Sequence, residues 1–503
     1  MPDSTAISIV SAPGKVLLAG GYLVLDRQYS GLVVGTSSRF FTSIAPGQRP
    51  RSITVKSPQF TDGFWSFGIK WEQGAVEIQP SSGQKENPYL EKTLCHTLTL
   101  ASVLSSSFGS RIEQGLDIVI VGHNDFYSQR EQLEQQHLPL TSASLSSLPN
   151  FCSTLAPIGQ VHKTGLGSSA AMITSVVGAL LSHFGVAELP RNRHVSEWSE
   201  QELYSARLVH NVAQFTHCLA QGKIGSGFDV SSAVFGSHSY RKFSPSVLDP
   251  LLSRAMQPDS PRLTGSDLLQ ALDPNQAADR WDNVVSTFDL PRGFIMMLAD
   301  IDAGSSTPKL VSQVLSWRKS KPDECKQLWD EIHAHNTCID SSLRKLCALS
   351  VQYPEVYDRT ISKLAVVPAD RWETEAAADD HGLSVLELGI TIFKEFQNVR
   401  RNLRLMSQLA GVPIEPEEQT RLLDRCMQVP GVIMAGVPGA GGFDAIFCIV
   451  LSQPSKEAVE ACWSEWKEMA VGPLLARESN GGISRMDLDD VPEFKQWLTS
   501  HVC

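Results

Sequence analysis

The segment KTGLGSSAAM, residues 163–172, stands directly before an apolar stretch with helical spacing. Met172, Val176 and Leu180 share one face of that stretch, and a second apolar set widens the face, which predicts a helix over 168–184 buried on most sides. Gly165 and Gly167 let the backbone turn tightly, so that successive N–H groups and the positive end of the helix dipole face one concavity. We therefore predict an anion site at the start of this helix.

The glycine loop alone leaves other interpretations open. It also fits a plain helix start, in which Ser168 and Ser169 cap the helix instead of meeting phosphate or magnesium. The loop further matches the G-x-G-x-x-A pattern of dinucleotide-binding folds, with Glu188 about 20 residues on. Residues 160–164, QVHKT, do not form the apolar strand that this pattern needs, and the sequence contains no Walker A loop. The dinucleotide interpretation is therefore disfavoured.

Towards the N-terminus, apolar runs surround the tripeptide Ala12-Pro13-Gly14 and end at Gly20-Gly21. This pattern predicts two strands joined by a tight turn, with Lys15 at the turn exit. Residues 32–36 and 51–57 are expected to be further strands.

Towards the C-terminus, residues 206–221 predict a second buried helix that ends at Gly222. The Gln- and Ser-rich stretch 128–157 is interpreted as a surface insertion, and the Pro-, Asp- and Ser-rich stretch 245–282 as an interdomain connection. The remaining expected elements are a strand near 294–300, helices over 308–318, 325–350 and 384–410, and a strand and glycine turn over 432–450.

Composition sets broad limits on the class of protein. The 503 residues are 42% hydrophobic and 19% charged with a net charge of −11, which favours a globular protein of two or three domains and argues against nucleic acid or an anionic membrane as partner. The ten cysteines form no C-x-x-C pair, a pattern typical of free thiols in a reducing compartment. No signal peptide or long apolar span is recognised, and the final His-Val-Cys does not match a peroxisomal address. We expect a cytoplasmic location.

Three segments together resemble the motifs of the GHMP kinase superfamily: SAPGKVLLAGGYLVLD at 11–26, KTGLGSSAAM at 163–172, and AGVPGAGGFDAI at 435–446. The resemblance implies an α/β (α+β) fold of two domains with the active site between them. The N-terminal, ATP-binding domain, expected over 1–245, would be ribosomal-protein-like, and the C-terminal domain, expected over 285–503, ferredoxin-like.

Within the superfamily, further segments resemble the phosphomevalonate kinases of the fungal and plant type. They are NPYLEK at 87–92, HNVAQ at 210–214, AQGKIGSGFDVSSA at 220–233 and IEPEEQTRLLD at 414–424. The resemblance implies ATP and 5-phosphomevalonate as substrates, magnesium as cofactor, and a monomer or homodimer. The alternatives are another enzyme of the superfamily, a mevalonate kinase or a diphosphomevalonate decarboxylase, or a sensor without catalytic activity on the same fold.

The resemblance also implies roles for single residues. Lys15 and Asp229 would be the catalytic pair, although a surface lysine and an N-cap aspartate are the plain alternatives. Ser168 would contact magnesium. ATP would meet Lys163, Gly165, Leu166, Gly167, Ser168, Ser169 and Ala170. The residues themselves suggest acceptor contacts at Lys223, which flanks a glycine loop, and at Ser305, Ser306 and Thr307, although helix capping explains Ser306 and Thr307 equally well. The third loop, with Gly439, Ala440 and Gly441, is expected to close the site near the acceptor.

Many relatives in the superfamily add a glutamate from the helix that precedes the catalytic aspartate. Here residues 203–228 contain no carboxylate, and the helix shows a polar face of His210, Gln214, His217 and Gln221. Because magnesium prefers oxygen ligands, the two histidines are interpreted as hydrogen-bonding residues of the framework. A second protein ligand for the metal is left unassigned.

Overall fold

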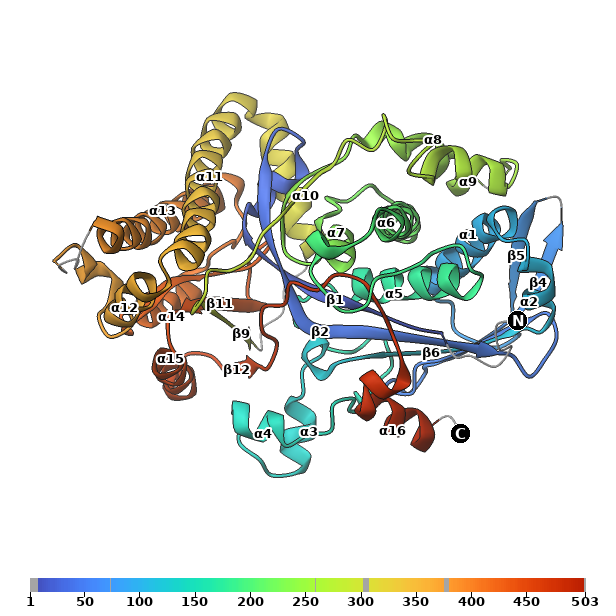
Figure 1. Cartoon of the computed structure of the whole chain (residues 1–503), viewed down its shortest axis with the longest axis horizontal. Helices are drawn as coiled ribbons and strands as arrows, with labels where there is room; N and C mark the ends of the chain where they lie inside the picture. The colour runs from blue at the N-terminus through green and yellow to red at the C-terminus, as the bar shows by residue number, and fades with distance from the viewer. Residues whose placement is uncertain (1–7, 73, 258, 302–306, 375–379, 502–503) are drawn as a thin grey trace.

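The computed structural model describes residues 8–501 apart from 73, 258, 302–306 and 375–379. A mixed sheet with strand order β13-β1-β2-β6-β3-β4-β5 forms the first half, and β7 extends it by pairing with β2 and β8 (Figure 1). Its strands are β1 (Ser8–Ala19), β2 (Ser30–Pro46), β3 (Ser52–Lys56), β4 (Phe64–Glu72), β5 (Ala75–Pro80), β6 (Leu116–Gly122), β7 (His238–Arg241), β8 (Val284–Thr287) and β13 (Ser484–Met486).

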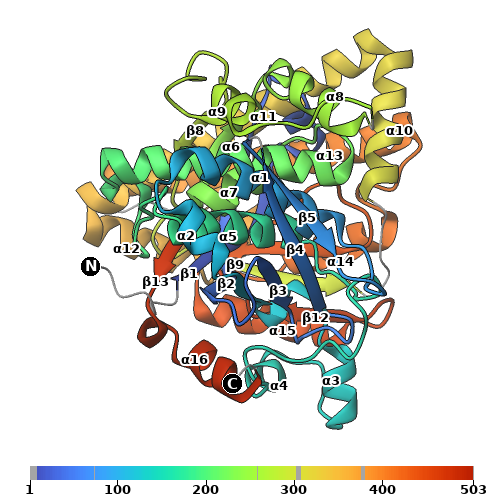
Figure 2. The same ribbon diagram turned by 90° about the vertical axis from the view of Figure 1, so that its right-hand side faces the viewer.

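Helices cover both faces of this sheet. Alternate side chains of a strand point to opposite faces, so Phe40 joins the core under α5 whereas Phe41 packs on Phe494 of α16. Figures 1 and 2 both show α16 on the opposite side of the sheet from α5. The helices of this half are α1 (Pro88–Leu104), α2 (Phe108–Glu113), α3 (Arg130–Gln135), α4 (Ser142–Ser146), α5 (Ser168–His183), α6 (Glu200–Gln221), α7 (Phe228–Phe235), α8 (Asp249–Met256), α9 (Gly265–Leu272) and α16 (Pro492–His501).

The prediction of two strands joined by a turn at 12–14 is wrong. β1 is one strand that pairs with β2 along its length, and its register shifts between Pro13 and Lys15 and again between Leu17 and Ala19. Pro13 and Gly14 therefore mark an irregularity in the ladder, which proline and glycine both favour. A Cβ atom on Gly14 would lie 3.0 Å from the Leu166 carbonyl oxygen, so the glycine serves a close approach of two segments and no chain reversal.

The second sheet has the antiparallel strand order β10-β11-β9-β12. Along the chain, helices α10–α14 separate the first strand from the second, and α15 precedes the last, which is the order of a ferredoxin-like domain. This agrees with the predicted fold class. The elements are β9 (Ile295–Ile301), β10 (Val432–Gly436), β11 (Ala445–Val450), β12 (Val471–Leu474), α10 (Thr307–Ser320), α11 (Pro322–Gln352), α12 (Pro354–Leu364), α13 (Asp380–Ala410), α14 (Glu417–Met427) and α15 (Gln453–Glu465).

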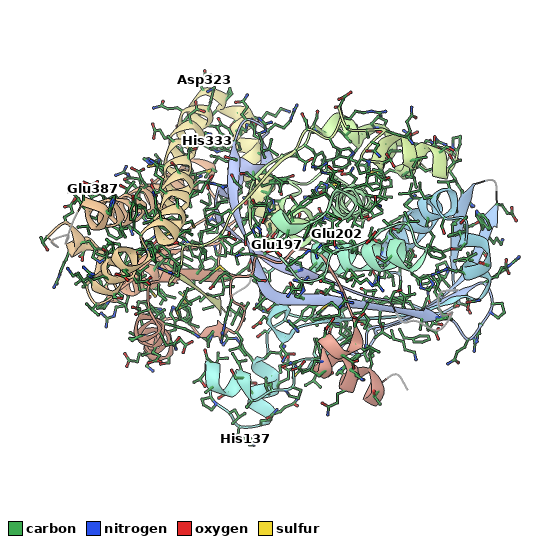
Figure 3. The ribbon with its side chains drawn as sticks, in the orientation of Figure 1. His137, Glu197, Glu202, Asp323, His333 and Glu387 are labelled. Carbon is green, nitrogen blue, oxygen red and sulfur yellow. The ribbon has the colours of Figure 1, made fainter. Side chains whose placement is uncertain are left out.

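The β1–β2 hairpin connects the two halves. Its tip, which includes the 3₁₀ turn Gly21–Leu25, packs against α10 and α11 in one apolar cluster. The Tyr29 hydroxyl donates to Asp330 at 2.8 Å, and its ring meets that of His333, which Figure 3 labels on α11. An ion pair between Asp26 and Arg318 adds a charged contact.

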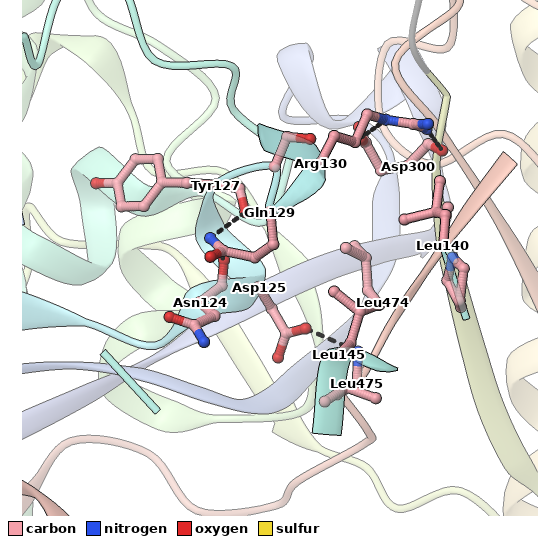
Figure 4. Close-up of a pocket in the computed structure, with 13 residues that line it drawn as sticks. Asn124, Asp125, Tyr127, Gln129, Arg130, Leu140, Leu145, Asp300, Leu474 and Leu475 are labelled. Carbon is pink, nitrogen blue, oxygen red and sulfur yellow. Dashed lines mark hydrogen bonds and ion pairs between the residues drawn. The ribbon is translucent and has the colours of Figure 1, made fainter. Parts of the chain in front are cut away.

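The stretch 128–157 contains α3 and α4 and touches the second half of the chain. Arg130 lies 3.6 Å from the carboxylate of Asp300 on β9, and its guanidinium donates to the Ala470 carbonyl at 3.1 Å. Figure 4 shows this contact beside a small pocket, in which Asp125 also accepts from the Leu475 backbone. The insertion is therefore an interface element as well as a surface loop.

The stretch 245–282 contains α8 and α9, which pack on α6 and α1. Residues 484–501 return to the first half, where β13 pairs with β1. The domain limits 1–245 and 285–503 stay predictions. No helix among the described residues is long and apolar enough to cross a membrane.

Candidate active site

The predicted anion loop opens α5. Gly165 and Gly167 have φ values of +80° and +77°, in the left-handed region that favours glycine. Gly167 is the N-cap residue, so Ser168 and Ser169 occupy the first helical turn and do not cap it. The capping interpretation of the two serines is thereby excluded, and their hydroxyls are engaged elsewhere.

Lys15 is attached to this loop by both its backbone and its side chain. Its N–H donates to the Leu166 carbonyl at 2.9 Å, and its ammonium donates to the Gly165 carbonyl at 2.8 Å. The ammonium also lies 5.3 Å from the centre of the Phe228 ring. Burial lowers the pKa of Lys15 below its ordinary value, and the negative charge of Asp229 acts in the opposite direction. Lys15 is a half-buried, anchored cation.

Asp229 lies in the first turn of α7. Gly227, with φ +83°, is the N-cap residue, so the interpretation of Asp229 as an N-cap is wrong. Its carboxylate accepts from the Val230 N–H at 3.0 Å, which the positive end of the helix favours. A Cβ atom on Gly227 would lie 2.8 Å from the side chain of Gln214, so the glycine lets the turn approach α6 closely.

One cleft of about 880 Å³ contains most of the predicted residues. It adjoins a second space of about 160 Å³, and Lys15, Gly165 and Thr307 line both. The predicted residues in the cleft are Lys15, Lys163, Gly165, Gly167, Ser168, Ser169, Lys223, Asp229 and Thr307, and those in the adjoining space include Gly439, Ala440 and Gly441.

Two predicted residues are placed differently. The side chain of Ala170 has 0% exposure and lies in the core, and Leu166 contributes its carbonyl to Lys15 while its side chain is buried. Ser305 and Ser306 lie outside the described residues.

The third glycine loop, between β10 and β11, is held by hydrogen bonds to the segment that begins α14. The Gly442 N–H donates to the Ile414 carbonyl at 2.8 Å, and Gln419 donates to the Gly442 carbonyl at 3.0 Å. Glu415, with 4% exposure, pairs with Arg400 at 2.7 Å and with Arg404 at 2.7 Å. The segment IEPEEQTRLLD thus fixes the backbone on which this loop rests.

The two serines of the first loop have different partners. Ser168 is hydrogen-bonded to the buried Tyr127, whereas Ser169 lies 3.1 Å from the Nε2 atom of His217 on α6. Among the described residues, no group of three or more His, Cys, Asp or Glu is arranged to hold a metal. The oxygen ligands that the cleft offers include the hydroxyls of Ser168 and Ser169 and the carboxylates of Asp229 and Asp444.

Several cleft residues were not predicted as site residues. They are Tyr89, Gln214, His217, Gln221, Phe228 and Asp444. All lie inside segments that carry the family resemblance, such as NPYLEK and AQGKIGSGFD, or on the polar face of the 206–221 helix. The unusual polarity of that helix face was the signal that could have identified three of them.

Comparison with known proteins gives consistent results. The family model described as GHMP kinases C terminal matches residues 392–471. A relative from Arabidopsis thaliana, named phosphomevalonate kinase, peroxisomal, is 36% identical over 94% of this chain and 95% of its own length. A phosphomevalonate kinase from Candida albicans is 34% identical over 88% of this chain and 89% of its own length.

Solved structures share the fold at low sequence identity. The Lin0012 protein from Listeria innocua superposes with a TM-score of 0.60 and 16% identity over 96% of this chain and 100% of its own. The phosphomevalonate kinase of Streptococcus pneumoniae, solved with phosphomevalonate and AMPPNP, gives 0.54 and 13% over 93% and 99%. The resemblance stated from the sequence is thus confirmed: the chain belongs to the phosphomevalonate kinase family of GHMP kinases.

Proposed function

We propose that this chain transfers the γ-phosphoryl group of ATP to (R)-5-phosphomevalonate, giving 5-diphosphomevalonate and ADP in the mevalonate pathway. The observation that carries the proposal is the convergence of Lys15, the Gly165–Ser169 loop and Asp229 in one cleft of a chain that belongs to this family. The two substrates named for the Streptococcus pneumoniae complex, phosphomevalonate and an ATP analogue, are the pair that this reaction needs.

The reaction brings two anions together. A phosphate monoester carries about −1.5 to −2 charge at pH 7, so its oxygen is already a usable nucleophile. The main barrier is repulsion from the ATP triphosphate, which positioning and charge neutralisation reduce. In this proposal the amides at the start of α5 hold the nucleotide phosphates, together with Lys163, and Lys15 neutralises charge between donor and acceptor.

Asp229 is proposed to orient Lys15 and the acceptor. Its charge acts on the Lys15 ammonium, and its own carboxylate is fixed by the Val230 N–H. Because the phosphate nucleophile does not need a strong base, an orienting charge suffices. The alternative, a general base, is required for a hydroxyl acceptor.

Magnesium is proposed to accompany ATP. It would neutralise charge on the transferred phosphoryl group, and it commonly keeps water and phosphate oxygens in its octahedral shell. The hydroxyl of Ser168 is the proposed protein ligand, and the Asp229 carboxylate lines the same cleft.

The acceptor is proposed to lie between the first and third glycine loops. Lys223 and Thr307 line the cleft, and Gly439, Ala440 and Gly441 line the adjoining space. Ser305 and Ser306 directly precede Thr307 in the chain and are proposed to add hydroxyl donors.

The test is one assay with three acceptors. Purified protein is incubated with ATP and magnesium, and ADP release is followed with 5-phosphomevalonate, mevalonate or diphosphomevalonate. We expect ADP release with 5-phosphomevalonate only. Turnover of mevalonate, or carbon dioxide release from diphosphomevalonate, would assign a different reaction, and ATP binding without turnover would favour a sensor.

The location and the assembly are part of the proposal. We propose a cytoplasmic enzyme, although the Arabidopsis relative is named peroxisomal. Two fluorescent fusions, one at the N-terminus and one at the C-terminus, leave the opposite terminus free and distinguish a cytoplasmic from a peroxisomal location. We propose a monomer or a homodimer, and light scattering on the purified chain distinguishes the two.

A further inference from the structure

His217 connects the phosphate-binding loop to the C-terminal end of α6. Its Nε2 atom lies 3.1 Å from the Ser169 hydroxyl and 3.1 Å from the side-chain amide nitrogen of Gln221, one helical turn further on. Gln221 is in turn hydrogen-bonded to Tyr89 of the NPYLEK segment. A chain of polar contacts thus runs from α1 through α6 to the second residue of α5.

The orientation of the Gln221 amide sets which of these groups donates. Gln221 turns its amide nitrogen towards His217, and because this nitrogen can only donate, Nε2 of His217 accepts and the ring proton is on Nδ1. The Ser169 hydroxyl, which faces the same nitrogen, must then donate as well. Both donors then point at the single lone pair of Nε2, each at 3.1 Å.

The surroundings of the ring favour the neutral form. His217 has 3% exposure, and burial lowers its pKa below the ordinary histidine value, with the charge of Asp229 acting in the opposite direction. A neutral ring accepts through Nε2, as the contacts require.

We propose that His217 is a positioning residue that accepts a hydrogen bond from the Ser169 hydroxyl, so that the lone pairs of the Ser169 oxygen are turned towards the cation bound with the nucleotide. This inference rests on the proposed function in one respect, namely that ATP binds at the Gly165–Ser169 loop. It revises the role of Ser169: a hydroxyl that donates to histidine has no proton left for a phosphate oxygen, and its lone pairs face a cation or a donor group.

The test compares two side chains of similar length at position 217. Both His217→Gln and His217→Met change the packing around α6. Only His217→Met also removes the acceptor of the Ser169 hydrogen bond, because the amide oxygen of glutamine can still accept it. The control is His210→Met, a buried histidine two turns earlier on the same helix whose Nδ1 contacts Asn211. Calorimetry measures binding of ATP with magnesium and of ATP with a chelator, and thermal unfolding is measured for every variant.

We expect His217→Met to weaken magnesium–ATP binding about 5- to 10-fold, the value of one hydrogen bond, and His217→Gln about 2-fold. Binding of ATP without magnesium, and the KM for 5-phosphomevalonate, should change less than about 2-fold in both, because an acceptor oxygen serves the cation. Combining His217→Met with Ser169→Ala should cost no more than Ser169→Ala alone.

Three outcomes would overturn the positioning role of His217. They are equal losses in the Gln and Met variants, additive losses in the double variant, and an equal loss in His210→Met. Weaker binding of metal-free ATP would contradict the acceptor role of Ser169. The calorimetric titrations of the single and double variants need no acceptor substrate, so their result is independent of the turnover assay. If 5-phosphomevalonate is not turned over, only the proposed function is contradicted.

Discussion

The first and third glycine loops face the same cleft but are held in different ways. The Gly165–Ser169 loop is attached to Lys15, a cation that lies in the cleft itself. The loop over Pro438–Gly442 is attached to the Ile414 carbonyl and to the Tyr22 hydroxyl, which donates to the Ala440 carbonyl at 2.8 Å. The buried ion pair of Glu415 and Arg400 lies in the segment behind it. One loop is stabilised by the charged group that we propose to act on substrates. The other is stabilised by uncharged contacts and by an ion pair that lines neither the cleft nor the adjoining space.

This difference separates two kinds of consequence. Substitutions at the first loop should change turnover and leave folding nearly intact, since the anchoring group is itself exposed to the cleft. Substitutions behind the third loop should change stability or acceptor affinity, since they move the backbone. The predictions below test this separation, in order of decreasing effect.

Lys15→Met should lower kcat at least about 10³-fold, because it removes the cation between two polyanions. The thermal unfolding midpoint should not fall, since a partly desolvated ammonium is removed. Steady-state kinetics and calorimetry measure the two. Lys70→Met, an exposed lysine on β4, is the control and should keep full activity. Undiminished turnover in Lys15→Met would end the proposed mechanism.

Glu415→Gln should destabilise the protein by about 3–5 kcal/mol, because Arg400 is left as a buried charge without its main partner. Urea unfolding measures this. The matched control is Glu417→Gln, whose carboxylate is exposed and should change stability by less than about 0.5 kcal/mol. A large fall in kcat without loss of stability would contradict the separation of roles.

Gly441→Ala should raise the KM for 5-phosphomevalonate about 10-fold or more. Its φ is +69°, and an added Cβ would lie 2.1 Å from the Ile414 carbonyl oxygen, so the loop must move. Gly439 also has a positive φ, but a Cβ atom added there would have no other atom within 4 Å. Gly439→Ala should therefore raise the KM about 5-fold at most. Equal effects of the two substitutions would show that backbone strain alone matters there.

Asp229→Asn should lower kcat about 10-fold, because the substitution removes a charge that orients Lys15 and the acceptor. A general base is typically worth about 10²–10⁴-fold, so a loss in that range would assign proton abstraction to Asp229. Rapid-quench measurement of the chemical step separates this effect from product release.

The smallest effect concerns pH. Lys15 acts as a cation, so kcat/KM for ATP should be lost as the pH rises through its pKa, which burial holds below the ordinary value of 10.5. The attraction of Asp229 raises this pKa, so Asp229→Asn should move the alkaline limb to lower pH. An unmoved limb would show that another group controls it.

Local patterns in the sequence predicted much of the fold. The helix over 168–184 and the end of α6 at Gly222 are confirmed, because apolar spacing and a left-handed glycine are local signals. β1 was misjudged at Pro13-Gly14, since its continuity depends on pairing with a distant strand. The role of Glu415 was not predictable, because its burial is defined only once Arg400 packs beside it.

The pairing of β13 with β1 has a consequence for synthesis on the ribosome. Ser11 and Met486, 475 residues apart, contact each other across this pair, and Arg39 donates to the carbonyls of Gly481 and Gly482. At about 5–20 residues per second, the β1 edge waits roughly half a minute to a minute and a half for its partner. During that time an open strand edge can pair with other chains, so we expect the nascent protein to depend on chaperones until its last helix emerges.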